Sequence, residues 1–368
     1  MKKIVKQAKS ESVQQKMDID MTLLSESVKE VALLKYDQFK EYWPQFVKSC
    51  LKHGLKADHP SFPIRALKKL LGCIMDDYID EAAHMYPLIC GHSQFVPILF
   101  SKTDEEKKEE MLSLILTLIK ANPSICSSVQ VPVYLGAYNA TMTKTDQLLF
   151  EILFLHETEG SVNLQTFKPL VWGQAAISKF SVLNKSKKAN HQTTKTLKVS
   201  EILALIQPEK MFQSALNMVS SFSADVESSY YDPRFFLPLF CQLCSPTSFV
   251  DKHLKLVESG GLALAFASLS CSDKNIRQMG MVTLNRMYLQ LEKARKSLSA
   301  EKQVGVYIVI DLMLINYLSI HKYLIKKNIY FKNNFLSNSS HSGLASLGRH
   351  CKKWFDWCFG AKQTNSTT

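Results

Sequence analysis

The stretch HLKLVESGGLALAFASLSCSDKNIRQMGMVTLNRMYLQLEKAR, residues 253–295, joins helical segments through sharp turns. A short helix is predicted to end at Ser259, where Gly260 and Gly261 supply a backbone that can turn sharply. A second helix, rich in Ala and Leu, follows at once, and Asp273 is expected to cap a third and longer one. Such a unit cannot bury its apolar face alone, so neighbouring units must stack on it.

The order of a short helix, a glycine turn, a helix and a long helix resembles an armadillo or HEAT repeat, whose period is about 40–47 residues. The rest of the chain also shows helical period, and few runs alternate with a period of two. The expected fold class is therefore all-α, an α-solenoid of armadillo/HEAT-like helical repeats. Thr103 and Thr143 are the predicted N-caps of two of its helices. Helices are predicted over 62–80, 84–100, 103–122, 143–157, 199–221, 249–258, 261–270 and 274–296.

The stretch YYDPRFFLPLF, residues 230–240, carries two prolines inside a helical pattern. Asp232 is expected to cap a helix and Pro233 to take its first turn, where a missing N–H costs little because that donor has no partner within the helix. Pro238 is expected to bend this helix of about 11–13 residues and to free the carbonyl of Arg234.

Length and composition allow two or three domains or one repeat array. The chain has 368 residues, is 46% hydrophobic and contains 20 Phe, so it can bury a large core. Its nine cysteines are odd in number and scattered, and the start lacks an apolar signal region, which predicts free thiols in a reducing compartment. The expected organisation is a disordered segment (1–20), a helical repeat region (21–180), a basic flexible loop (181–198), armadillo/HEAT-like repeats (199–297) and a divergent, basic, partly disordered helical tail (298–368).

The net charge of +12 is unevenly distributed. Residues 160–200 contain seven lysines and no acid, and residues 318–368 contain eight basic residues and one Asp. Stretches of this kind indicate a polyanionic partner, most often nucleic acid, although a solvated basic loop is the simpler alternative. Lysine contacts phosphate and reads no bases, so binding should be salt-dependent and weakly sequence-specific. The candidate RNA-contact residues are Lys179, Lys185, Lys187, Lys188, Lys195 and Lys198.

No pattern in the sequence supports catalysis, a cofactor or a small-molecule substrate. There is no glycine-rich phosphate loop, no G-x-S-x-G elbow and no H-E-x-x-H. Cys241 and Cys244 form a C-x-x-C without a second pair, so core cysteines are favoured over a metal or redox site. The apolar run 304–320 contains Asp311 near its middle, which favours a buried helix over a membrane span.

Three stretches together resemble the nucleolar pre-ribosomal-associated protein 1 family, in that order and at similar separations. They are YLGAYNATMTKTDQLLFEILFLHE (134–157), YYDPRFFLPLF (230–240) and KLVESGGLALAFASLSCSDKNIR with LEKAR (255–277 and 291–295). The blocks Y-x-A-T-x-x-x-x-D-Q and Y-D-P-R-F are unusual and occur together. The resemblance covers about residues 39–295 and fades after about residue 298. It marks the following residues as structural determinants: Tyr138, Asp146, Asp232, Pro233, Arg234, Gly260 and Arg277.

The resemblance implies a nucleolar, non-enzymatic scaffold that supports assembly of the large (60S) ribosomal subunit and pre-rRNA processing. Its implied partners are pre-ribosomal RNA, small nucleolar ribonucleoproteins and other large-subunit assembly factors, with no membrane. The alternative is an armadillo-type recognition module or transport adaptor that binds a peptide in its concave groove. Such a groove needs Asn or Trp repeated on successive third helices, whereas Trp43 and Trp172 show no regular spacing.

Overall fold

The computed structural model describes residues 40–56, 59–73, 79–160, 162–186, 197–219, 230–244 and 255–297. Within these ranges the regular secondary structure is helical, apart from one isolated antiparallel bridge between Thr141 and Tyr231. This part of the chain is therefore all-α, as the sequence predicts. It divides into two compact units. The first holds the described residues up to 186 together with 230–232, and the second holds 197–219 and the residues from 233 onward.

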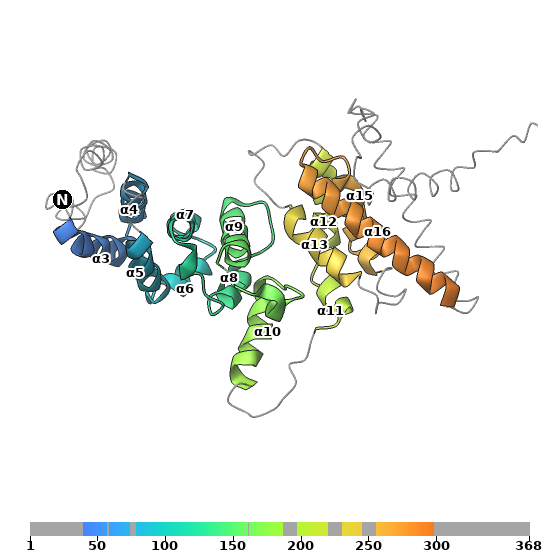
Figure 1. Cartoon of the computed structure of the whole chain (residues 1–368), viewed down its shortest axis with the longest axis horizontal. Coiled ribbons are helices and arrows are strands. Elements are labelled where there is room, and N and C mark those ends of the chain that lie inside the picture. The colour runs from blue at the N-terminus through green and yellow to red at the C-terminus, as the bar shows by residue number, and fades with distance from the viewer. Residues whose placement is uncertain are drawn as a thin grey trace, which may run out of the picture. The chain divides into compact units, whose positions relative to one another are not determined.

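In the first unit, each helix packs on helices that lie close to it in the chain (Figure 1). Helix α3 packs on α4, α4 on α7, α7 on α5 and α9, and α8 on α9 and α10. Trp43, Phe46, Phe95 and Tyr134 are among its largest fully buried side chains. Its elements are η3 (Lys40–Tyr42), α3 (Trp43–Gly54), α4 (Phe62–Cys73), α5 (Ile79–Cys90), α6 (Phe95–Leu99), α7 (Glu105–Ala121), η5 (Pro123–Ile125), α8 (Val131–Ala137), α9 (Lys144–Thr158), η6 (Leu164–Phe167) and α10 (Gly173–Ser186).

The second unit is built around α15 (Gly261–Ser268), in which every residue is buried. Helix α15 packs on α12 (Pro208–Val219), α13 (Pro233–Leu243) and α16 (Lys274–Ser297), and α13 also packs on α16. Gly260 precedes α15 with φ +77°, a conformation that glycine adopts without steric cost. The predicted glycine turn before this helix is thus confirmed. The short helix α11 (Val199–Leu203) precedes α12.

Two glycines, Gly261 and Gly280, allow close packing of α15 against its neighbours. A Cβ atom added to Gly261 would lie 2.8 Å from Cζ of Phe240, and one added to Gly280 would lie 1.7 Å from Oγ of Ser268. The Ser268 hydroxyl is itself fully buried and donates to the carbonyl of Ala265 at 2.6 Å. Helices α13, α15 and α16 therefore meet where a glycine leaves room for a side chain of the neighbouring helix.

The proline-containing stretch is a helix. Helix α13 begins at Pro233 and runs for 11 residues with Pro238 inside it. This start and this length confirm the prediction made from the sequence.

Several element boundaries differ from the predicted ones. Helix α7 is capped by Asp104 and not by Thr103, because the Asp104 carboxylate accepts the Lys107 N–H at 3.2 Å. The helix predicted over 84–100 is interrupted at 91–94, between α5 and α6. The region 199–221 forms two helices, because Pro208 disfavours helical backbone at the residue before it.

The basic loop predicted over 181–198 is shorter than expected. Helix α10 continues to Ser186, since neither proline nor a second glycine lies between Gly173 and that residue to end it. Residues 187–196 lie outside the described part, as does the apolar run 304–320. Among the described helices, none is both long and apolar enough to cross a membrane.

Candidate functional site

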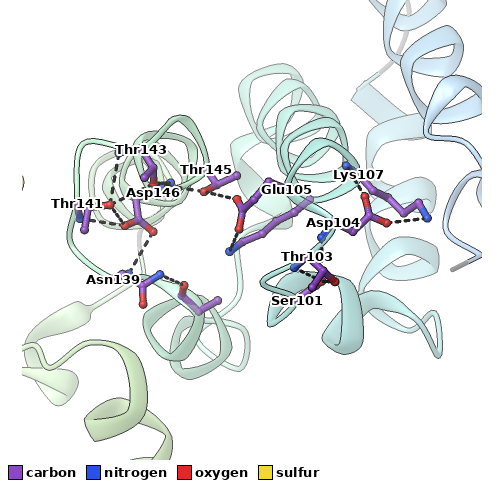
Figure 2. A network of polar contacts seen from close by, with 12 residues as sticks. Ser101, Thr103, Asp104, Glu105, Lys107, Asn139, Thr141, Thr143, Thr145 and Asp146 are labelled. Carbon is purple, nitrogen blue, oxygen red and sulfur yellow. Dashed lines mark hydrogen bonds and ion pairs between the residues drawn. The ribbon is translucent and has the colours of Figure 1, made fainter. Parts of the chain in front are cut away.

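A buried carboxylate organises the turn between α8 and α9. Asp146 is 1% exposed, and it accepts hydrogen bonds from the Asn139 N–H at 3.1 Å, from the Thr141 N–H at 2.9 Å and from the Thr141 hydroxyl (Figure 2). Burial raises the pKa of the Asp146 carboxyl, and the hydrogen bonds from Thr141 and Asn139 act in the opposite direction. The predicted N-cap is confirmed, because the Thr143 hydroxyl accepts the Asp146 N–H at 3.3 Å.

A segment more than 80 residues away in the sequence pairs with this turn. The Met142 N–H donates to the Tyr230 carbonyl at 3.0 Å, and the Asp232 N–H donates to the Ala140 carbonyl at 2.8 Å. The Gln147 side chain donates to the Asp232 carboxylate at 3.2 Å. Ala140 takes a positive φ of 58°, uncommon for a residue with a Cβ. Residues 139–147 and 230–232 are called the junction below.

The start of α7 adds a polar contact to the junction (Figure 2). The Thr145 hydroxyl donates to Oε2 of Glu105 at 3.1 Å, and Nζ of Lys108 lies 3.9 Å from Oε1 of the same carboxylate. Lys108 is buried, and its charge acts to lower the pKa of Asp146. The junction therefore ties α7 to α9 through side chains, and it ties the turn before α9 to the segment 230–232 through one isolated bridge and the Gln147–Asp232 contact.

The residues marked as structural determinants fall into two groups. Asp146 and Asp232 meet in the junction, and Tyr138, buried at the end of α8, accepts the Gly173 N–H through its carbonyl at 2.9 Å. Pro233 begins α13, and the half-buried Arg234 follows it. In the second unit, Gly260 forms the turn before α15, while Arg277 donates to the carbonyls of Cys271 and Ser272. Sequence reasoning did not identify Ala140 and Gln147 as junction residues, although both lie inside the quoted Y-x-A-T-x-x-x-x-D-Q block.

The candidate RNA-contact lysines are placed unevenly. Lys179 donates to the carbonyls of Phe167 and Pro169, at 3.3 Å each, and its Nζ lies 5.4 Å from the ring centroid of Phe180. Burial lowers the pKa of Lys179. This lysine thus has a structural role that the sequence did not predict.

For the other candidate RNA-contact lysines, the structure shows at most their position in the chain and their exposure. Lys198 is exposed directly before α11, and Lys185 lies in the last turn of α10. Lys187, Lys188 and Lys195 lie outside the described residues. Contact of this lysine set with RNA stays a prediction.

The C-x-x-C pair consists of core cysteines. Cys241 and Cys244 are buried free thiols, and burial raises the pKa of Cys244 to about 12. Such thiols hold their protons at neutral pH and are poor nucleophiles. No three His, Cys, Asp or Glu side chains of the described ranges lie together as ligands for a metal ion.

Comparison with known proteins gives a relative for most of the chain. Nucleolar pre-ribosomal-associated protein 1 of Mus musculus is 30% identical over 285 residues, and that of Homo sapiens is 29% identical over 291 residues. Each match covers 69% of this chain. The chain belongs to this family. The family and the nucleolar location expected from the sequence are thereby confirmed.

The alignment covers only a small part of each relative. The aligned part covers 12% of the length of each relative, so the chain corresponds to a small portion of these proteins. No family model matches the chain, and no solved structure matches it.

Proposed function

We propose that this chain is a non-enzymatic scaffold in nucleolar ribosome assembly. The observation that carries the proposal is its similarity, at about 30% identity over 69% of the chain, to relatives named as pre-ribosomal-associated proteins. Because the alignment spans 12% of each relative, the proposal concerns the role of the matching segment.

The helical packing supports an α-solenoid of armadillo/HEAT-like repeats. In each unit, helices contact mainly those that lie near them in the chain, as expected for stacked repeats. Solenoids present extended surfaces to large partners and need no enclosed pocket. This arrangement suits a protein that holds other components in place.

The charge supports RNA as one of the partners. A net charge of +12 attracts the phosphate backbone, and lysine contacts give affinity without base recognition. The proposed assembly step is that of the large (60S) subunit, including pre-rRNA processing. The proposed partners are pre-ribosomal RNA, small nucleolar ribonucleoproteins and other assembly factors.

Imaging and sedimentation of the tagged chain test the proposal together. A nucleolar signal, with co-migration of the chain and pre-large-subunit particles in a gradient, is the expected result. Crosslinking followed by sequencing of the bound RNA should then recover pre-ribosomal RNA. Cytoplasmic signal without RNA association would overturn the proposal and favour the peptide-binding adaptor.

A further inference from the structure

Among the described residues, the helices α3 and α4 and their connection carry a strongly unbalanced charge. Residues 43–73 contain six Lys or Arg and two His but a single Asp, and neither helix contains an acidic residue. Two of these cations are neutralised within the unit. Arg65 lies 2.7 Å from Glu106 and 2.6 Å from Glu110 of α7, and Lys68 lies 3.1 Å from Glu110.

Three other lysines are exposed along α3 and just beyond its end. Lys48 and Lys52 lie in α3, and Lys56 lies two residues after its last residue, Gly54; we call these three residues, each four apart in the sequence, the lysine row. Within the helix, Lys48 and Lys52 share one face and lie about 6 Å apart along the axis. None of the three ammonium groups pairs with a carboxylate of the described residues. Like charges four residues apart on a helix destabilise it slightly, so Lys48 and Lys52 do not stabilise α3 by pairing with each other.

Contacts beneath the row hold it in place. The Lys107 side chain, 3% exposed, donates to the Lys56 carbonyl at 3.0 Å and pairs with Asp104 at 2.9 Å. The end of α3 is thus fixed to the start of α7. The half-buried rings of His53 and His59 lie 5.7 Å apart at the same end of the helix and carry further N–H groups.

We propose that the lysine row binds the phosphate backbone of RNA. The inference rests on the proposed function, in which RNA is the polyanionic partner, and it assigns that contact to a structured surface. The exposed positions of α3 itself are Pro44, Gln45, Lys48 and Lys52, and none of them carries a large apolar side chain. Protein interfaces concentrate their binding energy in a few buried residues, most often Trp, Tyr and Arg, whereas phosphates are bound through positive charge. The row therefore fits RNA better than an acidic protein segment.

Fluorescence anisotropy with the full chain tests the row. The probes are a labelled RNA hairpin of arbitrary sequence and an unstructured oligouridine of equal length, each titrated at several salt concentrations. The variant K48Q/K52Q/K56Q should bind the hairpin roughly 10–100-fold more weakly at physiological salt. The slope of log affinity against log salt should fall in magnitude by about 2–3, at about 0.7–0.9 for each phosphate that the variant no longer neutralises. The variant K48R/K52R/K56R should retain binding.

A matched control separates the row from net charge. Lys102, Lys120 and Lys144 are exposed lysines of the same unit, and K102Q/K120Q/K144Q removes the same charge. This control should keep most of the affinity and the salt slope. Equal losses in both triple variants, or an unchanged K48Q/K52Q/K56Q, would overturn the inference. So would a row variant that keeps RNA affinity and loses binding to polyglutamate.

The outcome for the wild type separates the two proposals. A wild-type chain that binds RNA and co-sediments with pre-ribosomal particles, while the row variant does the same, rejects only the row. A wild-type chain that binds neither probe and migrates apart from those particles rejects the proposed function and the row with it.

Discussion

One contact in each unit illustrates a different way of joining helices. In the first, the junction depends on the buried carboxylate of Asp146, which accepts two backbone N–H groups and a hydroxyl. In the second, α15 and α16 meet where Gly280 leaves room for the Ser268 hydroxyl. A hydrogen-bonded junction is weakened when a group is removed, and a close contact is weakened when an atom is added. Substitutions at Asp146 and at Gly280 should therefore affect different units.

Asp146→Ala should have the largest effect. It leaves the buried N–H and hydroxyl groups of Thr141 without their acceptor, at about 1–3 kcal/mol each, and it also removes the acceptor of the Asn139 N–H; relief of the carboxylate desolvation offsets part of this. We expect a loss of about 4 kcal/mol in the free energy of unfolding of the first unit, as measured by urea denaturation. Hydrogen exchange on the full chain should show faster exchange in α8 and α9.

The control for this substitution is Asp146→Asn, which keeps the shape and one oxygen acceptor. It should lose about half as much stability. Equal loss of protection in α15 and α16 would contradict the independence of the two units.

Gly280→Val should be the next largest change, and it acts on the second unit. Replacing an ordinary helical glycine by a residue with a side chain stabilises the helix. Here the new Cβ would lie 1.7 Å from the Ser268 oxygen and 3.0 Å from the Ala265 carbonyl, so we expect a loss of about 3 kcal/mol. Gln278→Val, at an exposed position of the same helix, controls for β-branching. Its effect on the urea midpoint should be small, and an equal effect of both substitutions would reject close packing at Gly280.

Lowering the pH should change the stability of the first unit by less than these two substitutions change the stability of their units. His156 is fully buried; its Nδ1 is paired with the Ile152 carbonyl at 2.8 Å, and its Nε2 has no hydrogen-bond partner among the described residues. Burial lowers the pKa of His156, so the unfolded chain binds the proton more readily. Stability is full above the unfolded pKa of about 6.5 and falls as the pH drops through the lower folded value. Asp146, whose pKa burial raises, contributes with the opposite sign at more acidic pH.

The measurement is the urea midpoint of the first unit between about pH 7.5 and pH 5.5. His156→Asn should lower stability at every pH and flatten the profile. His84→Asn, at an exposed position of α5, should leave the profile unchanged. A profile that keeps its slope in His156→Asn would assign the pH dependence to other groups.

Sequence reasoning located features that depend on chemistry within a few residues. The Thr143 cap, the helix start at Pro233 and the turn at Gly260 are of this kind. The pairing of Met142 with Tyr230 was out of reach, because one isolated bridge between distant segments leaves no period-two pattern. The sequence also cannot distinguish a lysine that faces solvent from one that, like Lys179, donates hydrogen bonds to two backbone carbonyls.

The smallest expected effects come from a matched pair of N-caps, one in each unit. The Thr143 hydroxyl caps α9, and the Asp273 carboxylate caps α16 by accepting the Asn275 N–H at 2.7 Å. Thr143→Ala and Asp273→Ala should each cost about 1 kcal/mol, and Thr143→Ser and Asp273→Asn should restore most of it. Hydrogen exchange should place each loss in the first turn of its own helix. Because each cap accepts a backbone N–H in the first turn of its helix, a much larger loss for Thr143→Ala would show that the junction transmits the damage, which the glycine contacts of the second unit do not.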